Sequence, residues 1–510
     1  MSELITNDAQ RLHPLSWVFY FASLTPKLLF PLFGLLVLGQ NQNQWALWAL
    51  VIIVPIYLWV GLRAWLYRYQ ISADELLIRD GVLDRTLRHI PLARIQNVSQ
   101  RRKFLHRFLG VTELRLESAS GKKPEAVMRV VSTAAATELE AILRGRHTLL
   151  NPGASANLPP TRVLHQLPLA EILRLGLISN RGTVVTLALF GAAMQKDVLR
   201  NFFAHKITGT GHNLQQMMTD QIALHHYFRL TLVILIGLAG IFILLRVLSV
   251  VLALLRYKGF TLELEGERLL AQHGLGTQVR TSARLPRLQH WLLEESWLHR
   301  RFRRCRLAVT VVGSNHHDRH DKFGADSNFT ELAPIATMEQ AQALLRLCLP
   351  RLEWDQLQWQ RLPAAAKRRL LGQARWLLPA IAGLFWLNHA LAWRLPWPLL
   401  VLALVLLMAG LVAHALAWQG FAGYAESGEI LLFRSGVFRK RWVIVATSRL
   451  QALRLVSTPI DRRLGIQTLQ ADTQGGSRRK RALHIPYLEQ PAAQGLRERI
   501  WQRLHTNARF

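Results

Sequence analysis

The chain has 510 residues, which is longer than one hydrophobic core usually organises, so several domains are predicted. Half of its residues are hydrophobic, yet its formal net charge is +31. Ordinary soluble domains rarely combine these two properties, whereas membrane spans flanked by basic residues do. Cys305 and Cys348 are the only cysteines, which excludes a disulfide framework, and we expect two reduced thiols with structural roles.

Six apolar segments occur in three pairs along the chain. Each has, or nearly has, the length of helix that crosses roughly 30 Å of hydrocarbon at about 1.5 Å per residue. The predicted spans are 15–39 and 45–62, 177–194 and 230–255, and 376–392 and 398–418. The residues before the first span, MSELITNDAQRLHP, show neither a basic n-region nor a cleavage site, so we expect an uncleaved anchor.

The positions of the basic residues predict the orientation of these spans. Of the 63 Lys and Arg residues, 18, 20 and 16 fall in the segments 63–176, 256–375 and 419–510. Bases that flank the spans directly, such as Arg63, Arg256 and Arg375, are the stronger signal because long segments translocate with little regard to charge. We therefore expect a multi-pass protein of a bacterial inner membrane with both termini and all three long segments in the cytoplasm.

One phrase occurs three times after these pairs of spans: GVLDRTLRHIPLARIQNV at 81–98, GLGTQVRTSARLPRLQHW at 274–291 and GVFRKRWVIVATSRLQAL at 436–453. An offset of 193 superimposes the first copy on the second without a gap, and an offset of 355 superimposes it on the third. In each copy a glycine is followed thirteen residues later by Arg-(Ile or Leu)-Gln. The shared residues are Gly81, Arg94 and Gln96; Gly274, Arg287 and Gln289; and Gly436, Arg449 and Gln451.

The repeated unit has the pattern of a β-rich domain. Apolar and polar residues alternate on both sides of the shared glycine, which predicts two strands joined by a turn that uses positive φ. Each copy closes with a predicted helix, at 132–144, 337–349 and 491–504, and Thr337 with Gln340 predicts a capping box at the second of them. The expected fold class is α+β: six transmembrane helices in three hairpins, each followed by a barrel or bent sheet capped by its C-terminal helix.

The paired spans, the opening Tyr69, the turn glycine, the phrase IPLARIQNV and the later Leu109-Gly110 resemble the bacterial pleckstrin-homology (PH) type domain of the YdbS/YdbT-like membrane proteins. The layout with three domains and six spans is similar to that of the YdbT-like members. The middle copy departs most, because Phe302-Arg303 replaces the Leu-Gly pair and a segment GSNHHDRHDKFGADSN is inserted. The predicted divisions are a tail and first hairpin at 1–66, PH-like domains at 67–150, 257–350 and 419–510, linkers at 151–176 and 351–375, and hairpins at 177–256 and 376–418.

Basic clusters are the strongest functional signal in the three domains. They are candidate contacts for anionic phospholipid or a protein partner, or else a solvated face that follows from the positive-inside rule. The cluster residues are Arg101, Arg102, Lys103, Arg107, Arg300, Arg301, Arg303, Arg304, Arg439, Lys440, Arg441, Arg478, Arg479, Lys480 and Arg481. The repeated Arg-x-Gln could also bind an acidic partner, but we expect it mainly to fix the corner geometry of each domain.

Two further features leave alternatives open. His316, His317 and His320, with neighbouring Asp residues in the loop 315–321, have the density of a metal site, yet nothing elsewhere completes one, so no metal or cofactor is predicted. Arg246 lies inside a predicted span, where a charge suggests function by default, unless it snorkels or pairs with a neighbouring helix.

The sequence thus predicts an inner-membrane scaffold whose three PH-like domains bind a membrane or envelope protein or anionic lipid. A transporter or lipid-handling protein is the alternative, although the spans offer few polar residues and the hairpins all face the same way. An enzyme is not expected, because the sequence contains no recognisable catalytic constellation, and a nucleic-acid partner is not expected, because it contains no reading helix.

Overall fold

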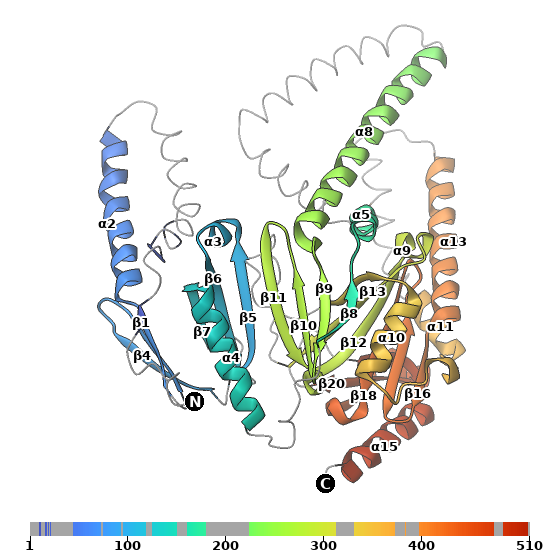
Figure 1. Ribbon diagram of the computed structural model, residues 1–510. Coiled ribbons are helices and arrows are strands. Elements are labelled where there is room, and N and C mark those ends of the chain that lie inside the picture. Colours follow the sequence, from blue (N-terminus) through green and yellow to red (C-terminus); the bar gives the residue numbers. More distant parts are fainter. Residues whose placement is uncertain are drawn as a thin grey trace.

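The computed structural model consists of three consecutive repeats of strands and helices, from which long apolar helices rise on one side (Figure 1). The structure describes residues 10–11, 16–17, 19, 21, 44–72, 75–92, 95–118, 125–149, 161–179, 224–312, 331–372, 383, 397–473 and 483–507.

Each repeat begins with four antiparallel strands, of which the first precedes the apolar helices and the other three follow them. In repeat 1 these strands are β1 (Gln10–Arg11), β2 (Arg68–Ile71), β3 (Glu75–Asp80) and β4 (Thr86–Pro91). In repeat 2 they are β8 (Arg162–Gln166), β9 (Thr261–Glu265), β10 (Arg268–His273) and β11 (Thr277–Arg284). In repeat 3 they are β15 (Gln360–Arg361), β16 (Gly423–Ser427), β17 (Ile430–Ser435) and β18 (Arg439–Ala446).

Each repeat continues with three more strands and a closing helix. In repeat 1 these are β5 (Ile95–Lys103), β6 (Val111–Ser118), β7 (Ala126–Ser132) and α4 (Thr133–Leu149). In repeat 2 they are β12 (Leu288–Ser296), β13 (Cys305–Val311), β14 (Glu331–Ala336) and α10 (Met338–Cys348). In repeat 3 they are β19 (Leu450–Val456), β20 (Ile466–Thr473), β21 (Leu483–Glu489) and α15 (Gln490–Asn507). A short helix follows the first of these strands: α3 (Phe104–Phe108), α9 (Trp297–Arg301) and α14 (Pro459–Arg463).

The two groups of strands in a repeat pack face to face around one core. In repeat 1, Leu76 of β3 and Leu114 of β6 are fully buried in a cluster that also contains Leu139 of α4. In repeat 3, Leu431 and Leu469 stand at the equivalent positions and are buried in the same way. The sheet-rich α+β prediction is therefore confirmed for the described part of the chain.

Local sequence signals produced several features as predicted. The three closing helices are present, and the capping box of α10 is formed, with Thr337 Oγ1 accepting from Gln340 N (3.2 Å) and Gln340 Oε1 accepting from Thr337 N (3.0 Å). The turn glycine has φ of +117° at Gly81, +111° at Gly274 and +109° at Gly436. A Cβ at any of these glycines would lie 1.9–2.0 Å from a backbone oxygen three residues ahead, so no other residue fits the turn.

Strand pairing continues from one repeat into the next. The second half of repeat 1 and the first half of repeat 2 form one seven-stranded sheet in the order β7-β6-β5-β11-β10-β9-β8. The second half of repeat 2 and the first half of repeat 3 form another, in the order β14-β13-β12-β18-β17-β16-β15. The expected domains at 67–150, 257–350 and 419–510 are thus not structurally independent, because each shares a sheet with its neighbour.

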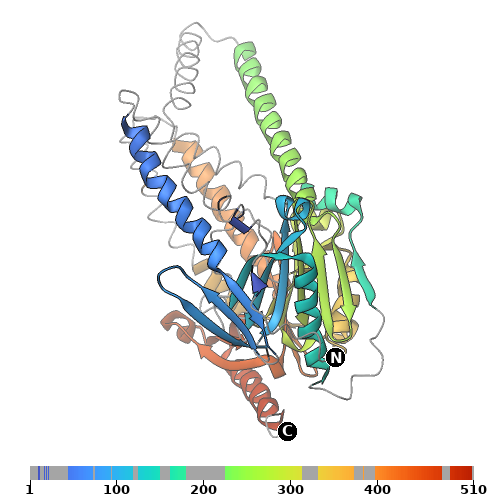
Figure 2. The same ribbon diagram turned by 60° about the vertical axis from the view of Figure 1, so that its left-hand side comes forward.

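Three apolar helices rise from the same side of the sheets: α2 (Gln44–Leu66), α8 (Leu224–Tyr257) and α13 (Trp397–Phe421) (Figures 1 and 2). By length and composition, 23 residues of α8 and 21 of α13 could cross a membrane, and α2 contributes a shorter apolar stretch, Val54–Leu66. The described residues therefore support two membrane-length helices rather than six. The expected spans 15–39, 177–194 and 376–392 lie outside the described residues except for a few positions, at 16–17, 19, 21, 177–179 and 383.

The segments expected to be linkers contribute ordered elements to the following repeat. Within 151–176 lie the edge strand β8 and most of α5 (Leu169–Ile178), and within 351–375 lie β15 and α11 (Ala364–Gly372). Leu167 and Leu362, each followed by a proline, are buried at the ends of these strands. Each repeat therefore begins before its apolar helices, and those helices are inserted between its first and second strands.

Candidate functional site

Edge-to-edge strand pairing joins the repeats at two places. Joint 1 pairs β11 with β5, and joint 2 pairs β18 with β12, both antiparallel. In joint 1 the opposed residues are Thr277 and Lys103, Gln278 and Arg102, Val279 and Arg101, and Arg280 and Gln100. In joint 2 they include Arg439 and Ser296, Lys440 and Glu295, Arg441 and Glu294, and Trp442 and Leu293. These pairs occupy equivalent repeat positions, so the same contact is made twice in the same register.

An arginine of the short helix closes each joint in the same way. Arg107 Nη1 of α3 donates to the backbone oxygen of Leu275 (3.0 Å), and Arg300 Nη2 of α9 donates to that of Val437 (3.1 Å). The two donors are equivalent in the repeat, and so are the two acceptors, which lie in the turn after the shared glycine. Cationic donors make stronger hydrogen bonds than neutral ones, so this contact helps to fix the tip of each joint.

The first basic cluster therefore lies on and beside joint 1. Arg101, Arg102 and Lys103 belong to β5, and Arg101 is almost fully buried there. Arg107 is used by the contact just described. The sequence identified these basic residues as a cluster. It could not show that they form a strand joint, because a solvated basic face has the same charge pattern.

Joint 2 is built around a buried carboxylate that the sequence analysis missed. Glu294 is 4% exposed and accepts from Arg439 Nη2 (2.6 Å), while Arg441 Nε (3.1 Å) and Arg306 Nη1 (3.4 Å) complete its ion pairs. Lys440 Nζ lies 4.4 Å from the ring centroid of Phe421. A buried carboxylate with three guanidinium partners is stable only while those partners stay in place, so this cluster makes the joint specific. The only sequence signal was Glu294-Glu295, an acidic pair within a basic region.

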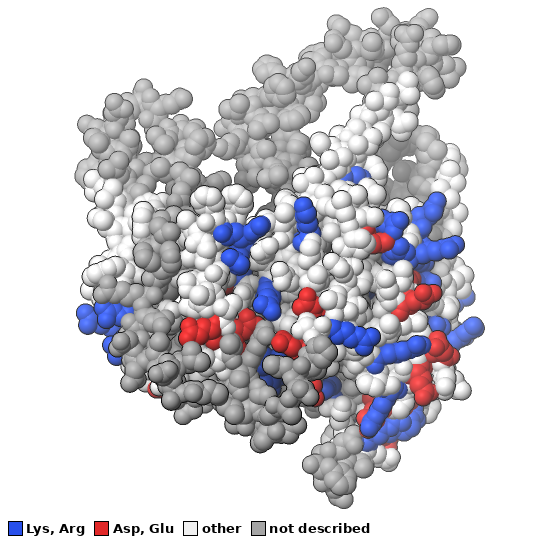
Figure 3. Space-filling model, in the orientation of Figure 1, with Lys and Arg blue, Asp and Glu red and all other residues white. Residues whose placement is uncertain are grey.

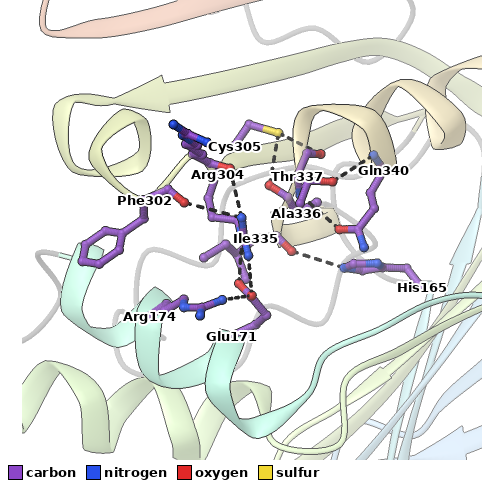
Figure 4. Close-up of polar contacts among 11 residues, drawn as sticks. His165, Glu171, Arg174, Phe302, Arg304, Cys305, Ile335, Ala336, Thr337 and Gln340 are labelled. Carbon is purple, nitrogen blue, oxygen red and sulfur yellow. Dashed lines mark hydrogen bonds and ion pairs between the residues drawn. The ribbon is translucent and has the colours of Figure 1, made fainter.

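Of the remaining cluster residues in repeat 2, Arg304 contacts α5. Arg304 donates to Glu171 of α5 through Nε (3.0 Å) and Nη2 (2.8 Å), and Arg174 also pairs with this carboxylate (Figure 4). These hydrogen bonds, led by that of Arg304, lower the pKa of Glu171. Arg301 and Arg303 are exposed. The last cluster, Arg478 to Arg481, lies outside the described residues.

A cavity of about 290 Å³ lies between the base of α8 and joint 2. Its lining is apolar on the side of α5 and α8, at Leu175, Ile178 and Ala253, and polar on the side of the joint. His299 lies in the polar wall, where burial, and then the charges of Arg306 and Arg439, lower its pKa to about 4. The histidine is therefore neutral at physiological pH.

Arg246 caps a neighbouring helix. Its Nη1 donates to the backbone oxygens of Leu177 (3.0 Å) and Ser179 (3.2 Å) at the C-terminal end of α5, and Ser249 Oγ donates to Ser179 O (2.7 Å). Carbonyls at a helix C-terminus have no intrahelical partner and carry partial negative charge, which an arginine compensates. The sequence left two alternatives for Arg246, snorkelling and pairing with a neighbouring helix. These contacts agree with the second.

The Arg-x-Gln motif lies at a corner of the chain in repeats 2 and 3. Arg287 and Arg449 end the 3₁₀ turns Leu285–Arg287 and Thr447–Arg449, directly before the strands of the second half. Burial is the main cause that lowers the pKa of Arg287 to about 10. Burial also lowers the pKa of Arg449. Gln289 is buried and donates to Arg287 O (3.4 Å), whereas Gln451 is exposed. Arg94 and the side chain of Gln96 lie outside the described residues, as does the loop 315–321.

Exposed aromatic side chains mark the end of the sheets from which the apolar helices rise. Phe104 and Phe108 of α3 are 71% and 84% exposed, and Trp297 of α9 is 62% exposed. Phe438, in the turn of repeat 3, is 70% exposed and stacks on His414 of α13 at 6.2 Å between centroids. In Figure 3, Lys and Arg side chains gather near this end with little acidic surface among them, while most acidic side chains lie further from it, among further basic ones.

These features define the class of the protein: a chain of three β-sandwich repeats, each closed by a helix, and joined edge to edge. The family described as bacterial PH domain matches residues 27–147, 224–352 and 376–504, and the chain belongs to this family. One match falls in each of the three repeats, the divergent middle one included, and the PH-domain part of the predicted resemblance is confirmed. Comparisons with curated proteins and with solved structures gave no match.

Proposed function

We propose that this protein is an inner-membrane scaffold that holds three PH-like domains against the cytoplasmic leaflet, where they bind anionic phospholipid headgroups. Six membrane-spanning helices in three hairpins, cytoplasmic termini and a three-repeat layout resembling the YdbT-like proteins are part of this proposal. A binding or scaffold role is what the bacterial PH domains suggest. A membrane or envelope protein bound to the outward faces of the repeats is compatible with the same arrangement.

The observation that carries the proposal is the aromatic rim formed by Phe104, Phe108, Trp297 and Phe438. A soluble domain gains nothing from exposing four large aromatic side chains at one end, whereas at an acyl chain boundary each would bury apolar area. Full burial of a Phe side chain is worth about 1.5–3 kcal/mol, and each nearby Lys or Arg adds about 1 kcal/mol beside an anionic leaflet. The rim and the apolar helices α8 and α13 occupy the same side of the sheets, so one membrane could contact both (Figure 1).

Lipid proximity of the rim can be measured with the full chain in vesicles. A polarity-sensitive dye is attached to Phe108→Cys, with Trp501→Cys on α15, half exposed at the opposite end, as the matched control. Burial raises the pKa of both native thiols, Cys305 and Cys348, to about 12, so they react slowly at neutral pH and the introduced thiol takes the label.

We expect nitroxide lipids to quench the dye at position 108 and not at position 501. Quenching should be stronger in anionic than in neutral vesicles and should weaken as salt screens the basic residues. If the dye at position 108 is no more quenched than the dye at position 501, the proposed membrane contact is wrong. If quenching ignores lipid charge and salt, the rim contacts lipid but the anionic-headgroup part of the proposal fails.

A further inference from the structure

The two ends of the array of repeats carry the same strand edges that form the joints inside it. β4 is the edge strand of its sheet, and β11 and β18, its equivalents in repeats 2 and 3, are the strands that pair with the preceding repeat. β19 is likewise an edge strand, and its equivalents β5 and β12 pair with the following repeat. Among the described strands, none pairs with the outer edge of β4 or of β19.

We propose that β4 of one copy pairs with β19 of a second copy of this chain, so that copies add head to tail through a third joint. This inference concerns self-association and does not depend on lipid binding. The two joints inside the chain fix its register, because both place equivalent residues opposite each other. The opposed residues of the third joint are then Asp84 and Thr458, Arg85 and Ser457, Thr86 and Val456, and Leu87 and Leu455.

The arginine that closes each joint is present at the free end as well. Arg462 of α14 is equivalent to Arg107 and Arg300, and it is exposed, with no side-chain partner among the described residues. Its acceptor would be the backbone oxygen of Val82, which is equivalent to Leu275 and Val437 in the other two joints. The two free ends thus present the donor and the acceptor of a contact that the chain makes twice.

Side chains at the free edges of β4 and β19 are more exposed than their equivalents in the joints, as expected for strands that lack a partner. Leu87 is 49% exposed, whereas Trp442, at the equivalent position in joint 2, is 8% exposed. Val456 is half-buried, whereas Arg101 and Glu294, its equivalents, are buried. Pairing would place Leu87 opposite Leu455, as Trp442 stands opposite Leu293 in joint 2.

The third joint would bring together both opposite and like charges. Asp84 is exposed at the tip of repeat 1 and would lie close to the basic pair Arg462 and Arg463 of α14. One opposed pair is unfavourable, because Arg88 would stand opposite Arg454, and like charges directly opposite destabilise strand pairing. The third joint should therefore be weaker than the two internal joints, as expected for an association between copies that is reversible.

A second copy is the occupant that the arrangement of the repeats favours. The repeats follow one another through heterologous joints, in which one edge always meets a different edge, and such contacts continue until a ring closes. Among the described strands the chain does not close on itself, because β4 and β19 are edge strands of two different sheets and do not pair with each other. The free edges are also templates for pairing, since their outward N–H and C=O groups have no strand partner.

Disulfide cross-linking in membranes tests the register. Residues directly opposite in an antiparallel pair have Cα atoms about 4.5–5.5 Å apart, which is within the range of a disulfide. One tagged full-length copy carries Thr86→Cys, and a second copy with another tag carries Val456→Cys. The register control replaces Val456→Cys by Leu453→Cys, which shifts the thiol by about 10 Å along the strand.

After mild oxidation we expect a cross-link between the two tags for the matched pair, at least ~10-fold above the register control, because disulfide geometry is that restrictive. Arg462→Ala should reduce the yield severalfold, and by more than Arg463→Ala, which removes a charge near Asp84 but no donor to the backbone oxygen of Val82. No cross-link between copies, or equal yields from matched and shifted thiols, would overturn the proposal. A chain that carries both cysteines and forms only an internal disulfide would also overturn it, because the array would then close on itself.

Discussion

Replacement of Gly436 by alanine tests whether the repeats form one continuous structure. Gly436 has φ of +109°, and a Cβ there would lie 1.9 Å from Arg439 O, so both the backbone conformation and the carbonyl must change. Such backbone strain costs about 1–3 kcal/mol, and a displaced Arg439 would lose a strand hydrogen bond worth about 1 kcal/mol. Weakening of the ion pair between the half-exposed Arg439 and Glu294 adds up to about 1 kcal/mol, because Arg441 and Arg306 still pair with this carboxylate. We therefore expect a loss of about 2–5 kcal/mol in stability.

The position of the damage is more informative than its size. Gly436 begins the turn before β18, and β18 pairs with β12 of repeat 2. Limited proteolysis should therefore show new cleavage in repeats 2 and 3, with a lower thermal midpoint, while Gly372→Ala, at a helical glycine with open space around it, should leave both unchanged. Damage confined to repeat 3 would refute the shared sheet, and wild-type resistance would refute the role of the turn.

Three further results are expected. Arg303→Gly should raise stability by about 1 kcal/mol in thermal unfolding, because Arg303 has φ of +51° where the other repeats have Gly110 and Gly465 at +65° and +66°. His299, whose folded pKa of about 4 lies below its usual 6.5, should weaken repeat 2 as the pH falls from 6.5 towards 4. In denaturant unfolding, the free energy of unfolding of the wild type should fall more steeply than that of His299→Gln between these two pH values, and the two should run parallel outside them. Reporters fused after Gly121, Gly324 and Gly475 should all be cytoplasmic, and those at 40–44 or near Gly211 should be outside.

Local signals in the sequence predicted the contents of a repeat well. A glycine between alternating segments identified the turn at Gly81 and its equivalents, because positive φ and a close backbone oxygen admit no other residue. Thr337 with Gln340 identified the start of α10, because its capping bonds involve only neighbours in the chain. These features depend on a few adjacent residues, so one sequence is sufficient to predict them.

The joints could not be predicted in this way. Alternation fixes which face of β5 or β12 is buried, but it does not state which strand lies beside its edge. Arg107 and Arg300 accordingly resembled a membrane-facing basic cluster, although each donates to a backbone oxygen of the next repeat. The short first strands were missed for another reason: Gln166-Leu167-Pro168 and Arg361-Leu362-Pro363 are similar in sequence, but they lie outside the apolar and glycine patterns that were aligned.

Shared sheets also constrain the apolar helices. Each apolar segment is inserted between the first two strands of a repeat, and these pair directly, as β8 does with β9 and β15 with β16. Both ends of an inserted segment are therefore fixed to neighbouring strands of one sheet, and the sheets are fixed to each other by the joints. Arg246 and Arg304 add a second attachment, because Arg246 bonds the end of α5 to α8 and Arg304 bonds α5 to the start of β13. A force on one apolar helix must then be carried through β12 and β18 into the next repeat, so the three repeats should move as one unit.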